Sequence, residues 1–527
     1  MVGSMTLQNV VVDRQFVLLA AAVICLGWSV FVFFVQIVGV SQLFRFFSRP
    51  PSPPISPTLP ADQIPHITVI RPIKGWESAW YECLASSFRQ SYPKDRMTIC
   101  LCVASADDPS YPFLQRLINE HPGFDAHILV EEEDPVLHGL GGKVDNLGPN
   151  PKIRNISRAY REAKGDVIWI VDANVWISEG VAGRMVDKLH GFRPDAQRAR
   201  PFKFVHQLPL VVDIPPATST PTNLWSTWGG RLDEMFMSTT HAKFYGAINS
   251  LGVAPCVLGK SNMFRKSHLE KCTDPAQNPI LSSWEVSRGR GIDFFSSYIC
   301  EDHLIGDLLW KSSLPGFSNH GLVFGDLAIQ PTTLMSVSDY IARRVRWLRV
   351  RKWTVIAATL VEPGVESLLC CLYFSFAVTT LPFFSWLLPQ TWTTMFAVWA
   401  MSVTIWMLLD RLTSSLLMQC HSVDVNENTP TYAKGVGRPG GEPPRPFLPW
   451  LIAWIGREAL ALPIWTWAVL LGTTVVWRGK KFTVTMDMRA IEIPAGESRV
   501  MVPETVPLMN GSGSGSGPSR RSKDRVE

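Results

Sequence analysis

Acidic side chains stand at the ends of two apolar, β-rich runs of this sequence. Asp108 follows the run 98–104, and Asp172 comes directly after the run 166–171. In open α/β sheets, ligands bind beyond the carboxyl ends of the strands, so we expect both carboxylates to face one crevice. Such a carboxylate suits Mg²⁺ or Mn²⁺, which take oxygen ligands and keep bound phosphate and water. The alternative is that each aspartate caps the turn or helix that follows it.

A third acidic pair, Glu301-Asp302, stands where a helix is expected to begin, so capping is again one interpretation. The functional interpretation is a general base, because a carboxylate near an electrophilic carbon can accept the proton of an attacking hydroxyl. Six cationic side chains follow between Arg343 and Lys352. They spread around the whole helix circumference, which fits a helix lying flat on lipid headgroups poorly. Metal-binding acids followed by arginines instead predict a diphosphate held between them.

The elements that must position these residues alternate between short β-rich runs and helical intervals, as in βαβ units with a mainly parallel sheet. The runs lie at 66–70, 98–104, 126–130, 166–171 and 203–208. The clearest helix is 150–164, with Asn150 as its cap and Pro151 in its first turn. The sequence therefore predicts an α/β domain over 66–335.

Long apolar segments predict an integral membrane protein among the 527 residues. Residues 16–40 carry no charge and are long enough to span a bilayer as an anchor. The runs 367–388 and 390–409 are also uncharged, and 449–477 is apolar except for Arg457 and Glu458. A net charge of only +5, with basic residues close to the spans, argues against nucleic-acid binding.

The remaining segments complete the expected organisation. An N-terminal segment, 1–15, precedes the anchor, and a proline-rich linker, 41–65, is expected to be an extended spacer that holds the domain off the membrane. A basic interfacial segment, 336–362, leads to a transmembrane or re-entrant region, 363–478, and a tail, 479–527, largely disordered at its end. Ten cysteines without a CxxC pair are typical of small buried side chains in a reducing compartment.

Positive charge near the spans predicts the topology. Arg45 and Arg49 follow the anchor, which places the α/β domain in the cytosol. Three further single crossings would put the basic run 478–481 on the opposite side, against the same rule. We therefore expect 449–477 to be a hairpin or re-entrant element.

The order Asp108, Asp172, Asp302 and then "RRVRW" (343–347) resembles the D, D, D, (Q/R)xxRW signature of inverting, family-2-like glycosyltransferases with a GT-A fold. Several longer runs look like those of the ceramide glucosyltransferase family: "RPIKG" (71–75), "CVASADDP" (102–109), "NPKIRN" (150–155), "HQLPLVVD" (206–213), "THAKFYGAINSLGVAPCVLGKS" (240–261) and "ICEDHLIGD" (299–307). The resemblance covers most of 66–353. It implies an α/β GT-A domain, Rossmann-like with a mainly parallel sheet, combined with transmembrane helices.

The resemblance also implies roles for particular residues. Asp108 and Pro72 would contact the nucleotide, Asp172 would hold Mg²⁺ or Mn²⁺ on the UDP diphosphate, and Asp302 would deprotonate the acceptor hydroxyl. Arg343 and Arg346 would stabilise the departing UDP. Further residues with implied roles are Trp347 at the sugar or acceptor pocket, Lys152 at the phosphates, and His241 in the active site, where the alternative is a hydrogen-bonded core histidine.

One departure from the family pattern concerns the metal. Asp172-Ala173-Asn174 offers one carboxylate where many GT-A enzymes have two, so the cation is expected to rely on phosphate and water ligands as well. The other arginine-cluster residues, Arg349, Arg351 and Lys352, are expected to meet anionic lipid headgroups.

The reaction that the resemblance implies is transfer of glucose from UDP-glucose to the primary hydroxyl of ceramide with inversion, at a Golgi or ER membrane with the domain facing the cytosol. A processive polysaccharide synthase shares the signature but needs more transmembrane helices than this chain offers. Transfer to a polyprenyl phosphate is a second enzymatic alternative. A transporter or lipid-binding protein without catalysis is an alternative from another class, although the uncharged spans lack the ionisable residues typical of transport paths.

Overall fold

A computed structural model describes residues 2–77, 79–138, 147–195, 197–214, 224–281 and 289–494. At its centre lies a seven-stranded mixed sheet with strand order β3-β2-β1-β4-β6-β5-β7. The strands are β1 (Ile67–Pro72), β2 (Met97–Val103), β3 (Asp125–Val130), β4 (Val167–Val171), β5 (Phe202–Asp213), β6 (Ser261–Arg265) and β7 (Ser318–Thr332). β1 pairs in parallel with β2 and β4, β2 with β3, and β5 with β7, which confirms the predicted mainly parallel sheet. β6, which the sequence did not reveal, runs antiparallel between β4 and β5.

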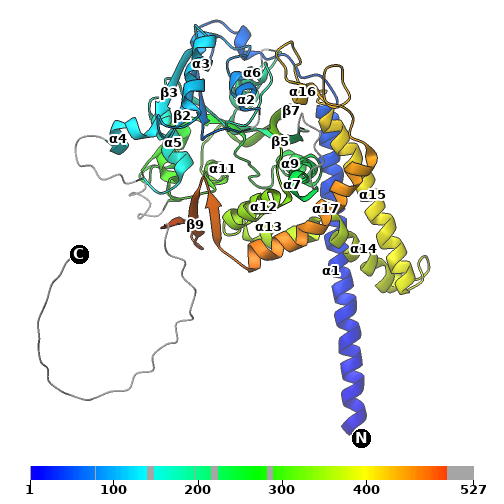
Figure 1. Ribbon diagram of the computed structural model, residues 1–527. Coiled ribbons are helices and arrows are strands. Elements are labelled where there is room, and N and C mark those ends of the chain that lie inside the picture. Colours follow the sequence, from blue (N-terminus) through cyan, green and yellow to red (C-terminus); the bar gives the residue numbers. More distant parts are fainter. Residues whose placement is uncertain are drawn as a thin grey trace, which may run out of the picture.

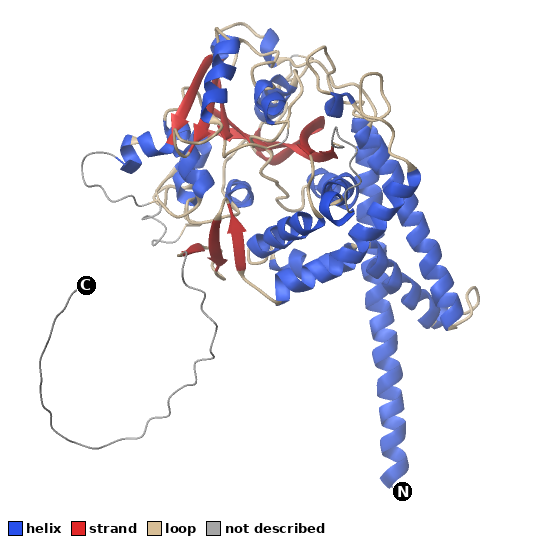
Figure 2. Ribbon diagram, in the orientation of Figure 1, coloured by secondary structure: helices blue, strands red, loops and turns tan. Residues whose placement is uncertain are grey.

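Helices cover both faces of this sheet (Figures 1 and 2). On one face, α2 (Trp80–Ala85), α3 (Tyr111–Glu120) and α6 (Val181–His190) contribute to one hydrophobic core. On the other, α5 (Pro151–Arg161), α10 (Lys266–Cys272) and α11 (Glu301–Lys311) contribute to a second core. The short α4 (Pro135–His138) follows β3. Asn150 caps α5 as predicted, since its side chain accepts hydrogen bonds from the Lys152 and Ile153 amides.

A third group of helices connects the sheet to the apolar part of the molecule. α7 (Leu224–Thr227) and α8 (Gly229–Phe236) lead into a π-helical turn, Met237–His241, and then α9 (Ala242–Leu251). α12 (Val337–Arg351) carries the arginine cluster and begins with a capping box between Ser336 and Asp339.

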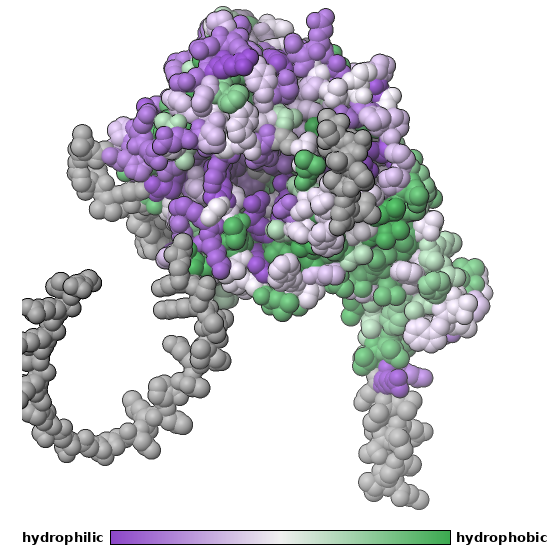
Figure 3. Space-filling model, in the orientation of Figure 1, coloured by the Kyte–Doolittle hydropathy of each residue, from purple (hydrophilic) through white to green (hydrophobic). Residues whose placement is uncertain are grey.

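The apolar helices gather beside this domain, where Figure 3 shows hydrophobic side chains. α1 (Val2–Phe47) packs along α9, α14 (Ser367–Thr380) and α15 (Trp392–Met418). Among the described residues, three helical segments are long and apolar enough to cross a membrane: Arg14–Phe47, Trp392–Met418 and Phe447–Leu470. A bent pair, Ile356–Val365 with Ser367–Thr380 at 74°, is a candidate broken span or re-entrant loop. The first half of this pair contains α13 (Ile356–Val361).

The proline-rich linker differs from the free spacer that the sequence predicts. α1 continues to Phe47, and the residues after it bind the surface of the α/β domain. The Ile55 and Ser56 amides donate to the Asp187 carboxylate on α6 at 2.6 and 2.7 Å. The expectation failed because the prolines fix an extended backbone but do not reveal that α6 offers it a buried carboxylate.

The C-terminal segment differs as well. α16 (Thr431–Lys434) is followed by α17 (Phe447–Trp465). α17 is one continuous helix, so the hairpin, one of the two expected forms, is wrong, and the re-entrant element stays a prediction. The chain then forms an antiparallel three-stranded sheet of β8 (Thr474–Trp477), β9 (Lys480–Val484) and β10 (Ala490–Ile493). The boundaries expected at 478 and 479 are therefore wrong, because they divide this sheet between a membrane region and a tail. The end of the tail, which the sequence predicts to be disordered, lies outside the described residues.

Candidate active site

Asp172 follows β4, and its carboxylate lies between two lysines. Lys152 Nζ is 3.0 Å from Oδ1 and Lys260 Nζ is 2.9 Å from Oδ2. The antiparallel pairing of β4 with β6 places Lys260 there, and the Asp172 amide donates to the Lys260 carbonyl at 3.1 Å. Burial raises the pKa of Asp172, but the two ammonium groups outweigh this and hold the pKa below its ordinary value. Asp172 is therefore an anion at neutral pH.

Lys152 joins Asp172 to the acidic pair at the start of α11. Its Nζ lies 3.1 Å from Glu301 Oε1, while Glu301 Oε2 accepts from Asn150 Nδ2 at 3.2 Å. The cap of α5 thus also anchors the first residue of α11. Lys152 thus lies at the carboxyl end of β4, where the sequence predicts a crevice, and its charge serves two carboxylates. Its role at the phosphates stays a prediction.

Asp302 lies against Gly259, just before Lys260. A Cβ on Gly259 would come within 2.9 Å of Asp302 Oδ2, so only glycine leaves room for the carboxylate. Burial raises the pKa of Asp302, although Lys152 opposes the shift. A carboxylate with a raised pKa accepts a proton more readily near neutral pH, which is the property of a general base.

α12 presents Arg346 toward the same crevice. Burial lowers the pKa of Arg346 to about 10, with Arg343 adding to the shift and Asp172 opposing it. Within the described part of the chain, Arg346 makes no recorded hydrogen bond or ion pair, so its guanidinium can serve an anionic ligand. Arg343 is engaged differently: its Nε lies 3.2 Å from Asp233, and its guanidinium lies 4.6 Å from the Trp347 ring centroid.

Arg349 and Lys352, two of the three residues expected at lipid headgroups, are buried and donate to backbone carbonyls, so that expectation is wrong for them. Arg349 Nη1 donates to the Thr474 carbonyl at 2.6 Å, and Lys352 Nζ donates to the Gly472 carbonyl at 3.0 Å. Arg351 forms an ion pair with Glu362. The reason is that the chain after α17 returns to α12 and offers it carbonyl groups, which the order of residues does not reveal.

The same return of the chain brings Arg478 close to Asp172 and Glu301. In the sequence, Arg478 was considered only as part of the basic run that indicates topology. Arg478 lies at the β8–β9 turn with φ of +50°, and its carbonyl accepts a hydrogen bond from Lys74 Nζ. Burial lowers the pKa of Arg478, while Asp172 and Glu301 oppose the shift. A basic residue beside a glycine, in "WRGKK", was the available signal.

Asp108 and Pro72 lie at the adjoining edge of the sheet. Pro72 ends β1 in register with Cys102 of β2. Asp108 accepts from the Gly75 amide at 3.1 Å and from the Ser110 amide at 2.9 Å. Burial raises the pKa of Asp108, but these hydrogen bonds outweigh it and lower the pKa overall. Asp108 thus caps its own turn, in line with the alternative interpretation, and also fixes the loop after β1.

His241 ends the π-helical turn between two aromatic rings. Its ring centroid lies 5.7 Å from that of Phe236 and 5.1 Å from that of Tyr245. Burial lowers the pKa of His241 to about 3, helped by Arg344 and Arg351, so the imidazole is neutral. Its Nδ1 is buried and without a hydrogen-bond partner among the described residues. Trp347 packs nearby, against Phe236, Met237 and Val211.

The donor set at Asp172 fits a divalent cation that substrate phosphates help to coordinate. Mg²⁺ is commonly held by one or two carboxylates together with phosphate and water. No group of three or more His, Cys, Asp or Glu side chains suited to a metal occurs among the described residues. The protein alone therefore supplies Asp172 and not a complete coordination shell.

The structure thus gathers Lys152, Asp172, Asp302 and Arg346 around one crevice, with Lys260, Glu301 and Arg478 as additions. Lys260 stands in the quoted run "VLGKS", but its role follows from the pairing of β6, which sequence reasoning missed.

Comparison with known proteins adds sequence relatives. The model of the family described as glycosyl transferase family 21 matches residues 29–274 and 277–490. The ceramide glucosyltransferase of Pyricularia oryzae is 57% identical over 89% of this chain and 94% of its own length. That of Gibberella zeae is 47% identical over 93% of this chain and 96% of its own length. A solved mannosyltransferase from Pyrobaculum calidifontis, in complex with GDP-Man and Mn²⁺, matches 76% of this chain and 98% of its own at 15% identity and a TM-score of 0.36.

Proposed function

This chain belongs to glycosyl transferase family 21, and from that membership we propose that it transfers glucose from UDP-glucose to the primary hydroxyl of ceramide. The product is β-glucosylceramide, and UDP is released. The observation that carries the proposal is the crevice at the carboxyl end of β4. It combines a buried carboxylate of raised pKa with a set of cationic side chains, beside helices apolar enough for a bilayer.

The donor's diphosphate suits the cationic side of the crevice. Lys152 and Lys260 form ion pairs with the Asp172 carboxylate. The same carboxylate opposes the lowering of the pKa values of Arg346 and Arg478 by burial. Ammonium and guanidinium groups fixed in a partly dehydrated site stabilise a departing diphosphate strongly, because they need little reorganisation when its charge develops. Arg343 has the supporting role of holding Trp347, through the stacking described above.

A divalent cation, Mg²⁺ or Mn²⁺, would be held by Asp172 together with donor phosphate oxygens. When bound, it would neutralise part of the diphosphate charge. Lys152 and Lys260 would then be free to bind the phosphates themselves. Asp108 keeps the loop after β1 and Pro72 in place for the nucleotide.

The chemical step is a single displacement. Asp302 accepts the proton of the ceramide hydroxyl as its oxygen forms a bond to the anomeric carbon of glucose. The bond from that carbon to the diphosphate oxygen breaks, and UDP leaves with the electron pair. Attack from the face opposite UDP inverts the configuration from α to β. His241, neutral and close to Arg344, lines the approach to this step.

The cellular setting follows from the same arrangement. UDP-sugars are cytosolic, so we propose that the α/β domain faces the cytosol at a Golgi or ER membrane. The basic turn 478–481 packs on this domain, which keeps it on the cytosolic side.

The test uses detergent-purified protein with ceramide, Mg²⁺ or Mn²⁺, and either UDP-glucose or UDP-galactose, with the lipid products read by mass spectrometry. We expect one hexose added from UDP-glucose, and only a small residual activity in Asp302→Asn. Asp307→Asn is the matched control, because Asp307 lies on the same helix and pairs with the exposed Lys311. A polymer would identify a polysaccharide synthase. In a parallel reaction with polyprenyl phosphate in place of ceramide, a product formed there alone would identify that alternative. No sugar transfer at all would favour a non-catalytic role.

A further inference from the structure

An apolar groove opens between α14, α15 and α17, outside the crevice described above. Its volume is about 600 Å³, within the range of roughly 300–1,000 Å³ typical of small-molecule sites. Its walls carry Leu368, Leu369 and Leu372 from α14, and Met395, Phe396 and Trp399 from α15. These helices belong to the part of the chain suited to a bilayer, so a lipid can reach the groove from the side.

One end of the groove is polar. Glu366, at the break between α13 and α14, and Glu458 of α17 line it. Arg457 is ion-paired with both glutamates and donates to Thr240 Oγ1 at 2.9 Å. Glu458 is 4% exposed, and the Ser367 side chain at the start of α14 lies beside it. A carboxylate accepts hydrogen bonds, so this end suits a ligand group that donates one.

The polar end continues toward the crevice. A second, smaller hollow shares Pro363, Glu366 and Ala461 with the groove and is also lined by Phe236 and Arg344. Phe236 contacts His241, and His241 stacks on Tyr245. Burial raises the pKa of Tyr245, with further contributions from nearby Cys256 and Asp302. Shared lining residues and neighbouring aromatic rings therefore lead from the apolar groove to His241 and Tyr245.

We propose that this groove binds one hydrocarbon chain of the ceramide, and that Glu458 accepts a hydrogen bond from its amide or hydroxyl region. The inference rests on the proposed function, because it assigns a place to the acceptor of that reaction. It accounts for three features together: an apolar groove open to the bilayer, a carboxylate at its end, and a row of aromatic rings leading from it to His241 and Tyr245. A lipid with donor groups beside its chains meets all three.

The first experiment compares Leu372→Trp, which narrows the groove, with Leu412→Trp on the lipid-facing side of α15, where Leu412 is 56% exposed. We expect Leu372→Trp to raise the KM for long-chain ceramide roughly tenfold, as if about two methylenes were displaced. The KM for short-chain ceramide should rise much less. Leu412→Trp should leave the ratio of the two KM values as in the wild type.

The second experiment needs no variant. Ceramide with a photoreactive group near the end of its acyl chain is irradiated with the wild-type protein, and the labelled peptides are identified. Labelling within α14, α15 or α17 that unlabelled ceramide competes away supports the groove. Labelling confined to other segments, or an unchanged KM ratio in Leu372→Trp, overturns it. If wild-type protein binds UDP yet glucosylates no ceramide, the proposed function fails instead, so the two failures are distinguishable.

Discussion

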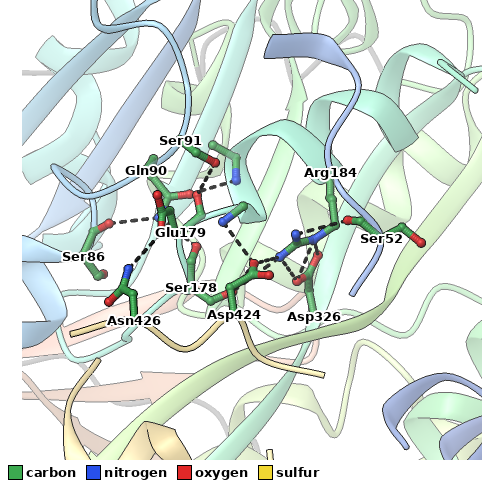
Figure 4. A network of polar contacts seen from close by, with 12 residues as sticks. Ser52, Ser86, Gln90, Ser91, Ser178, Glu179, Arg184, Asp326, Asp424 and Asn426 are labelled. Carbon is green, nitrogen blue, oxygen red and sulfur yellow. Dashed lines mark hydrogen bonds and ion pairs between the residues drawn. The ribbon is translucent and has the colours of Figure 1, made fainter. Parts of the chain in front are cut away.

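Removing the Arg184 guanidinium should destabilise the α/β domain, because this residue neutralises a buried carboxylate. Figure 4 shows Arg184 of α6 between Asp326 and Asp424. Arg184 Nε donates to both Asp326 oxygens, at 3.0 and 2.8 Å, and Nη2 contacts Asp424 Oδ2 at 2.7 Å. The Asp326 side chain is only 1% exposed. Asp424 follows α15, so the contact also ties the domain to the apolar helices.

The expected magnitude follows from this burial. In Arg184→Met, Asp326 stays buried without its cation, and removing one partner of a buried pair costs about 3–5 kcal/mol. At roughly 2–4 °C per kcal/mol for a domain of this size, the unfolding temperature should fall by about 6–20 °C. Arg116→Met is the control, because Arg116 pairs with Glu120 at the surface with its side chain 71% exposed, and such pairs contribute about 0–1 kcal/mol.

The assay is thermal unfolding in detergent at one fixed scan rate, so that slow irreversible steps affect all variants alike. The double variant Arg184→Met/Asp326→Leu should recover much of the loss, since no buried charge remains. In the single variant, burial keeps the pKa of Asp326 higher in the folded state than in the unfolded state. The free energy of unfolding should therefore be larger at low pH, where Asp326 is protonated, and should fall as pH rises through the folded-state pKa. A fall no larger than that of Arg116→Met, or a double variant as unstable as the single one, would refute the reasoning.

Three further predictions concern the crevice and its supports. Gly259→Ala places a Cβ 2.9 Å from Asp302 Oδ2 and should lower kcat by roughly a hundredfold, because the carboxylate must move. The control is Gly27→Ala, whose Cβ would meet no atom within 4 Å. Burial raises the pKa of Asp302, and a general base must be ionised, so the kcat of the wild type should fall as pH drops through that raised pKa. The residual kcat of Asp302→Asn should not show this fall at low pH. Arg349→Met removes the hydrogen bond to the Thr474 carbonyl, a charged interaction of about 1.5–3 kcal/mol. Amide hydrogen exchange in the sheet β8–β10 should therefore speed up. Unchanged exchange would contradict a stabilising role of Arg349 for this sheet.

The fold was predictable where local pattern decides structure. The first strands appear as apolar β-rich runs, and Asn150 with Pro151 marks the start of α5. The position of Asp172 beyond β4 followed from the general rule for open sheets. These features depend on neighbouring residues alone, which is why one sequence was enough.

The rest depends on contacts between distant segments. β6 enters the sheet between β4 and β5, so no local signal placed Lys260 beside Asp172. The strand β8 has the sequence "TVVW" and follows closely after the apolar helix α17. Its apolar residues therefore looked like the end of a membrane segment. Arg349 appeared free for lipid because its carbonyl partner, Thr474, lies 125 residues further along the chain.

The packing of α1 sets a timetable for synthesis of the protein. Trp28 of α1 donates to the Gly364 carbonyl, 336 residues later, and at about 5–20 residues per second that partner emerges roughly 15–70 s after Trp28. Gln36, 5% exposed in the finished protein, likewise has no hydrogen bond from Lys243 until α9 has been synthesised. The first helix must therefore enter the membrane alone, with polar groups still unpaired, and the ribosome delivers Gly364 only after the last strand of the α/β sheet, β7.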